Sequence, residues 1–140
     1  MNNGHTHVIP ERFARCMPLV RQRLADAGLS IAGEFDVSGE PHFQTTGHRS
    51  CVVLLVDTPG LLFECIAIDR AAAVFLPVHI VISGDRDSTS IHWADPIAIS
   101  GLRPPMPAKV PLEDLCARIA RALAGLPQAG EVGLLNQHTH

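Results

Sequence analysis

The sequence predicts an α+β domain, with helices packed on one face of an antiparallel sheet. The expected elements follow the order β-α-β-β-α-β-β-α, which has too few strand-helix-strand crossovers for a parallel, doubly wound sheet. The length of 140 residues fits one hydrophobic core. We therefore expect a single domain over residues 1–125, followed by a weakly ordered tail over residues 126–140.

Prolines and glycines place the first two elements. Residues 7–16 are expected to form an edge strand, because Pro10 weakens the run without excluding it from a sheet edge. Pro18 and Gly28 predict the start and the end of a helix, since proline suits the first helical position and glycine the position after the last. The buried stripe of this helix is expected to be Leu19, Val20, Leu24 and Ala27.

The middle of the chain predicts two strands and a second helix. Residues 29–37 alternate apolar and polar side chains, which is typical of a half-buried strand. A long loop over residues 38–49 leads to residues 51–56, which are apolar at both parities and therefore need cover on both faces. Thr58 and Pro59 predict the start of a helix that runs to about Asp69.

The second half predicts a hairpin and a third helix. Residues 77–83 and 89–100 are expected to pair around a tip at residues 84–88. The proline-rich residues 101–111 predict a stiff connector, and a helix follows from about Pro111 to Ala124. One core is expected to contain Leu29, Ile31, Phe35, Val52, Leu54, Ile80, Ile82, Trp93 and Ile119.

Several short segments, taken together in their order and spacing, resemble a known family. They are Leu24 to Leu29, Phe35 to Ser38, Asp57 to Gly60, Leu76 to Val81 and Trp93 to Pro96. The chain resembles the domain-of-unknown-function 302 family over roughly residues 12–124. The resemblance implies a TATA-binding-protein-like α+β fold and a homodimer, and it implies no transferable activity. Val78 stands where family members often have cysteine, so no thiol or metal role at that position carries over.

Composition excludes several classes of partner. The formal charge of −3, the pI of about 6.2 and the 4% of aromatic residues argue against binding to nucleic acid or an anionic membrane. The apolar runs are far shorter than the roughly 20 residues that span a bilayer, and no secretory signal is visible, so we expect a cytoplasmic protein. The four cysteines lack metal-binding spacing and are expected to be buried free thiols.

The sequence contains no common catalytic motif. Asp36 or Asp57 could serve as a general base, although aspartates at element ends usually cap turns or helices. Cys51 could act as a nucleophile only if the fold brings a histidine beside it. We therefore expect a non-enzymatic protein.

The histidines are the unusual feature of the composition. In the expected hairpin register Val81 pairs with His92, which places His79 and His92 on the same face as diagonal neighbours. A register shifted by two residues would place them directly opposite each other, still on that face. Two imidazoles can bind a transition metal or haem iron, but a closed metal site needs further ligands from another segment or another copy. His5 with His7, and His138 with His140, could chelate a metal adventitiously at the two ends of the chain.

The expected outward face of the sheet is apolar. Cys51, Val53, Leu55 and Val81 lie on it and would form an exposed stripe on a monomer, so we expect them at the interface of a symmetric homodimer. The leading hypothesis is a homodimeric module that binds a small ligand in the cleft between sheet and helices. The alternative is a metal- or haem-binding protein that uses the histidines of the hairpin over residues 77–100.

Overall fold

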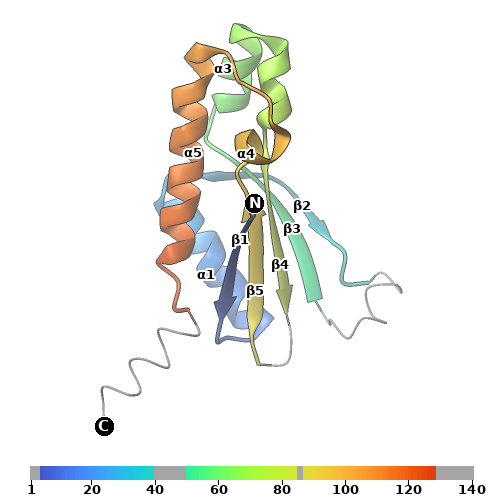
Figure 1. Ribbon diagram of the computed structural model, residues 1–140. Coiled ribbons are helices and arrows are strands. Elements are labelled where there is room, and N and C mark those ends of the chain that lie inside the picture. Colours follow the sequence, from blue (N-terminus) through green and yellow to red (C-terminus); the bar gives the residue numbers. More distant parts are fainter. Residues whose placement is uncertain (1–3, 40–49, 85–86, 129–140) are drawn as a thin grey trace.

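The computed structural model describes residues 4–39, 50–84 and 87–128. Its strands are β1 (Gly4–Ile9), β2 (Ser30–Asp36), β3 (Ser50–Asp57), β4 (Val78–Gly84) and β5 (Thr89–Ala94). They form one antiparallel sheet in the order β1-β5-β4-β3-β2 (Figure 1). The helices are α1 (Phe13–Asp26), α3 (Leu61–Ile68), the 3-10 helix η1 (Arg70–Phe75), α4 (Pro96–Ser100) and α5 (Met106–Ala124). The α+β prediction is confirmed.

The hydrophobic core lies between the sheet and the two long helices, α1 and α5. Alternate side chains of β3, β4 and β5 are buried on this face because the strand period is two. At the upper end of the sheet in Figure 1, α3, η1 and α4 gather together. The predicted core residues that are buried are Leu29, Val52, Leu54, Ile80, Ile82, Trp93 and Ile119, with Ile31 partly buried against them.

Phe35 is the exception, because 59% of its surface is exposed. The prediction that it joins the core was wrong. The register of β2 against β3 shifts between Ile31 and Gly33, so an extra residue turns the rest of β2 over. Ile31 therefore faces the helices, whereas Phe35 faces the opposite side together with Val53, its partner on β3.

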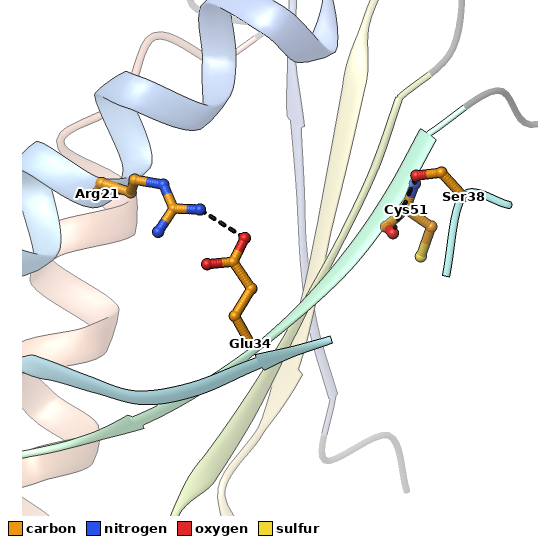
Figure 2. A network of polar contacts seen from close by, with 4 residues as sticks. All are labelled: Arg21, Glu34, Ser38 and Cys51. Carbon is orange, nitrogen blue, oxygen red and sulfur yellow. Dashed lines mark hydrogen bonds and ion pairs between the residues drawn. The ribbon is translucent and has the colours of Figure 1, made fainter. Parts of the chain in front are cut away.

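The same shift brings Glu34 to the helix side of the sheet. Its carboxylate there accepts a hydrogen bond of 2.6 Å from the Arg21 guanidinium of α1 (Figure 2). Both side chains are more than one-third exposed, so this ion pair orients α1 on β2 more than it stabilises the fold.

Two helices begin earlier than their prolines indicated. The first strand ends at Ile9, and α1 begins at Phe13, so the predicted strand over 7–16 and the predicted start at Pro18 were wrong. Pro18 lies inside α1 and Pro111 inside α5. Gly28 does follow the end of α1, with a φ of 78°.

The earlier start also changes the buried stripe of α1. Cys16 and Met17 join Val20 and Leu24 in the core. Leu19, which was expected to be buried, is 41% exposed, and Ala27 is partly buried. The stripe is therefore displaced toward the start of the helix.

The remaining boundaries move by a few residues. Helix α3 begins at Leu61 rather than Pro59, after Gly60 with a φ of 83°. Strand β5 ends at Ala94 rather than Ser100, because the Asp95 carboxylate accepts a hydrogen bond of 2.8 Å from the Ile97 amide and starts α4. Residues 40–49 of the expected loop, 85–86 of the hairpin tip and 129–140 of the expected tail lie outside the described residues.

Within the described ranges, no helix combines the length and the apolar character needed to cross a bilayer.

The 3-10 helix and α4 are additions to the predicted order of elements, which otherwise agrees with the structure. Leu126, just after α5, is 1% exposed and belongs to the core.

Candidate functional site

The hairpin of β4 and β5 places His79 and His92 on the face of the sheet that α1 and α5 leave open. Val81 pairs with His92 and Ser83 with Ser90, which is the predicted register. Both imidazoles are exposed, whereas their neighbours Ile80 and Ile91 are completely buried on the helix side. The sequence therefore predicted correctly that the two histidines share this face.

His92 is held by a neighbour on the edge strand. Its Nδ1 lies 3.1 Å from the Thr6 hydroxyl oxygen of β1, within hydrogen-bond distance. When Nδ1 carries the proton and donates to Thr6, Nε2 is left with a lone pair directed away from this contact. Sequence reasoning did not identify Thr6, because it assigned the strand that pairs with β5 to residues 7–16.

A shallow hollow of about 420 Å³ surrounds the two histidines. The residues that line it are Gly4, His5, Thr6, His79, Val81, His92, Trp93 and Ala94. Ala94 and its strand partner Gly4 have little or no side chain, which leaves room beside the imidazoles. The hollow is therefore a place where a small ligand or a second protein surface could reach both rings.

Apolar side chains run across much of the open face, with Ser83 and Ser90 as polar members at one end. Phe35, Val53, Val81 and His92 follow one another across four adjacent strands, and Thr6 completes the row on β1. Val53, Leu55 and Val81 are each partly exposed. The solvent-facing side of an antiparallel sheet usually carries polar or charged side chains, so this row is unusual for a surface in water.

Charge is almost missing from this face. Over the described strands, no outward position carries lysine, arginine or glutamate. The acidic residue with outward parity, Asp57, lies at the end of β3 and is 6% exposed. Two surfaces of this kind can therefore meet without like-charge repulsion.

Cys51 has the outward parity that was predicted, but it is 4% exposed. The Ser38 hydroxyl accepts a hydrogen bond of 2.9 Å from the Cys51 amide and donates one of 3.3 Å to its carbonyl oxygen (Figure 2). These two hydrogen bonds join Ser38, two residues after the end of β2, to the start of β3. Cys51 therefore contributes less to the exposed stripe than Val53 or Leu55.

The four cysteines are free and buried, as predicted. Burial is the main cause that raises the pKa of the thiols of Cys16, Cys51 and Cys65. Burial and the nearby Asp95 carboxylate raise the pKa of Cys116 to about 12. Because the thiolate is the reactive form, these environments disfavour a nucleophilic cysteine.

The two aspartates considered as bases do not form a pair. Asp57 lies opposite Ser30 and Asp36 opposite Val52, so they occupy the two ends of the β2–β3 ladder. Their backbones are roughly 17 Å apart, at about 3.3 Å per residue. Hydrogen bonds from Ser38 lower the pKa of Asp36, whereas burial raises the pKa of Asp57.

The terminal histidine motif at the start of the chain belongs to a strand. His5 stacks on Trp93 with ring centroids 4.5 Å apart, and it shares the helix side of β1 with His7. His138 and His140 lie outside the described residues. Among the residues that the structure describes, no group of three or more His, Cys, Asp or Glu side chains is arranged to hold a metal ion.

Sequence reasoning missed an apolar corner formed by η1, α4 and the start of α5. It has a hollow of about 510 Å³ and a neighbouring one of about 360 Å³, which share Leu102 and Arg103. Val74, Leu102 and Met106 are more than half exposed there. Side chains of the core cluster fill the space between sheet and helices, so the ligand cleft that was expected there was wrongly placed. The apolar hollows lie at this corner instead.

The comparisons with known proteins agree with the resemblance. The model of the family described as "Domain of unknown function DUF302" matches residues 5–126. The crystal structure of an uncharacterized conserved DUF302 protein from Bacillus stearothermophilus is similar, with a TM-score of 0.70 and 19% identity over 89% of this chain and 98% of that one. No curated protein matches the sequence. At this identity the solved structure supports the fold, and the likeness to the TATA-binding protein stays a prediction.

Proposed function

The chain belongs to the DUF302 family, whose function is unknown, and from that premise we propose that it is a homodimeric binding module whose two copies meet through the open face of the sheet. The observation that carries the proposal is the uncharged apolar row of Phe35, Val53 and Val81 on that face. A two-fold axis brings the same surface of both copies together, so one uncharged patch serves both partners without like-charge repulsion.

The test is the mass of the protein in solution, measured by light scattering at about 50 µM, well above the dissociation constant of an ordinary stable dimer. We expect twice the chain mass of 15.1 kDa. Val81→Asp introduces a charge on the central strand of the face and Phe35→Asp one on its edge strand β2. Each should give a monomer, because a buried unpaired charge costs several kcal/mol.

Val110→Asp is the matched control. Val110 is 70% exposed on α5, away from the sheet face, and its replacement should leave the dimer intact. A monomeric wild-type protein would contradict the proposed dimer. A dimer that dissociates in Val110→Asp but not in Phe35→Asp would show that the interface lies elsewhere. Circular dichroism of each variant verifies that the fold is retained.

The apolar corner supports a second candidate function, which is the binding of a small amphiphile. Arg103 lines both hollows, and none of the ion pairs among the described residues includes it, so its guanidinium can receive an anionic head group while the apolar body lies against Val74 and Leu102. Asp69 also lines the larger hollow, where its carboxylate accepts a hydrogen bond of 3.0 Å from the Ala71 amide. Lys109 also lines the smaller hollow, but its Nζ lies 3.9 Å from Oε1 of Glu113, an acidic partner that partly neutralises its charge. Arg103 is therefore the cation better placed to bind an anionic group.

Dodecanoate is a suitable probe for this corner. Isothermal titration should show saturable binding at one site per chain, and Arg103→Ala should weaken it about tenfold through loss of the charged contact. Arg121→Ala, which removes an exposed arginine in the last turn of α5, is the control and should have no effect. Equal weakening by both variants would show that only general charge attraction is involved.

A further inference from the structure

Resting on the proposed dimer, we infer that His79 and His92 of both copies together bind one divalent transition metal ion at the two-fold axis. The two imidazoles lie near the middle of a face that carries no lysine, arginine or glutamate on its described strands. β4, which carries His79, is the central strand of the five, and β5, which carries His92, lies beside it. A face-to-face dimer therefore places its axis close to these two side chains.

The spacing of the two histidines suits one metal ion. Val81 is the strand partner of His92, and His79 is two residues before Val81, so the histidines are diagonal neighbours on one face. Diagonal positions on an antiparallel pair are about 7–8 Å apart at the backbone, which lets two imidazoles lean toward a shared ion about 2.0–2.1 Å from each nitrogen.

The contact between Thr6 and His92 favours the ligating form of the ring. Histidine ligands usually have their other ring nitrogen hydrogen-bonded to an oxygen, which fixes both the tautomer and the ring orientation. The Thr6 hydroxyl lies 3.1 Å from Nδ1 of His92 and can hold it in this way, so Nε2 is presented to the hollow. Thr6 thus acts as a positioning residue for the metal ligand.

One chain does not complete the site. Two imidazoles fill half of a tetrahedral zinc site. His5 also lines the hollow, but its ring stacks on Trp93, and no third His, Cys, Asp or Glu of the described residues is arranged with His79 and His92 to hold a metal ion. A two-fold axis supplies the same pair again, which gives four neutral nitrogen ligands. The hollow around the histidines, with Gly4 and Ala94 in its lining, leaves space for the second pair.

A metal ion fits this arrangement better than haem. Haem with two histidine ligands requires one imidazole on each side of the porphyrin ring, whereas His79 and His92 project from the same side of one sheet. The neutral nitrogen ligands suit Zn²⁺, Cu²⁺ or Ni²⁺ rather than Mg²⁺ or Ca²⁺, which prefer oxygen.

The test uses Zn²⁺ alone, added to untagged full-length protein that has been purified without a nickel column and treated with a chelator. Calorimetry with light scattering should show one Zn²⁺ per two chains. His79→Ala and His92→Ala should each lower the affinity at least tenfold, and Thr6→Val should lower it about tenfold by freeing the ring of His92. His138→Ala with His140→Ala is the control for terminal chelation and should change nothing.

The outcomes separate this inference from the proposed function. A chelator-treated dimer that binds no Zn²⁺ overturns the metal site and leaves the dimer intact. A protein that stays monomeric with and without Zn²⁺ overturns both. One Zn²⁺ per chain, or binding that disappears in the His138→Ala, His140→Ala variant and survives in His79→Ala, also overturns the shared site. Because both histidines are exposed, their replacement should not disturb folding, which circular dichroism verifies.

Discussion

Leu54 shows most directly how a single residue stabilises this fold. It lies on β3 next to the central strand, faces the helices and is completely buried. Leu54→Ala removes apolar contacts and leaves a cavity, so the free energy of unfolding should fall by about 2–5 kcal/mol. Urea denaturation measures this change. Leu102→Ala, at a position that is 54% exposed, should change it by less than about 0.5 kcal/mol. Similar effects of the two variants would mean that the buried face of β3 is wrongly assigned.

Asp57 and Asp36 should make stability depend on pH in opposite directions. Burial raises the pKa of Asp57 above its ordinary value of 3.8, so the folded protein holds this proton more tightly than the unfolded chain. The stabilisation from Asp57 is therefore complete below that value and is lost as the pH rises through the raised pKa. The stability of Asp57→Asn relative to wild type should accordingly increase between about pH 3.5 and about pH 6.5.

The Asp36→Asn variant provides the contrast. Hydrogen bonds from Ser38 lower the pKa of Asp36, so its stabilisation is present above the ordinary value of 3.8 and is lost as the pH falls. The stability of Asp36→Asn relative to wild type should therefore decrease as the pH rises. Urea denaturation across the pH range measures both differences, and parallel curves for the two variants would contradict the assignment.

At the scale of the elements, period-two patterns were predicted and local interruptions were missed. Ile80, Ile82 and Ile91 alternate with polar or smaller side chains, which was sufficient to predict the β4–β5 register and the shared face of the histidines. β2 has the same alternation in its sequence, yet the extra residue between Ile31 and Gly33 reverses it. Gly33, a single glycine inside the strand pattern, was the available signal for a bulge, and the prediction did not use it. The exposure of Phe35 was missed for that reason.

The prolines misled the prediction of helix starts for a physical reason. Proline fits the first turn of a helix best, but Pro18 and Pro111 are each the sixth residue of their helices. Tertiary packing of Cys16 and Met17 before Pro18, and of Ala108 before Pro111, outweighs the local penalty. Burial of these apolar side chains therefore extends both helices toward their N-termini.

A stability measurement on α1 can verify this account. Pro18 has no amide proton for the carbonyl of Ala14, and its ring crowds the preceding turn. Pro18→Ala restores the hydrogen bond at an exposed position, so the free energy of unfolding should rise by about 1–3 kcal/mol, less the small gain in freedom of the unfolded chain. An unchanged or lower value in urea denaturation would show that the packing of α1 requires the local distortion of proline.

At the scale of the whole molecule, the sequence predicted that His79 and His92 share one face of the sheet with part of an apolar surface, but it did not predict the apolar corner. His79 and His92 come from one hairpin, so their proximity follows from local pairing. The corner combines Val74, Ile97, Leu102 and Met106 from separate segments, and only the packing of η1, α4 and α5 brings them together. Thr6 joined the site for a similar reason, because the pairing of β1 with β5 links residues 86 positions apart.

The proposed dimer and the single core together predict how the whole molecule unfolds. Trp93, the one tryptophan, is 5% exposed on the helix side of β5, in the core cluster that extends from β1 to the end of α5. Its fluorescence and the far-ultraviolet circular dichroism should therefore report the same cooperative transition in urea. Because dissociation accompanies unfolding of a dimer, the midpoint should rise between about 5 µM and about 200 µM protein. Phe35→Asp, expected to be monomeric, should have a midpoint that does not depend on concentration. A wild-type midpoint that is equally insensitive, or two transitions that do not coincide, would contradict the dimer or the single core respectively.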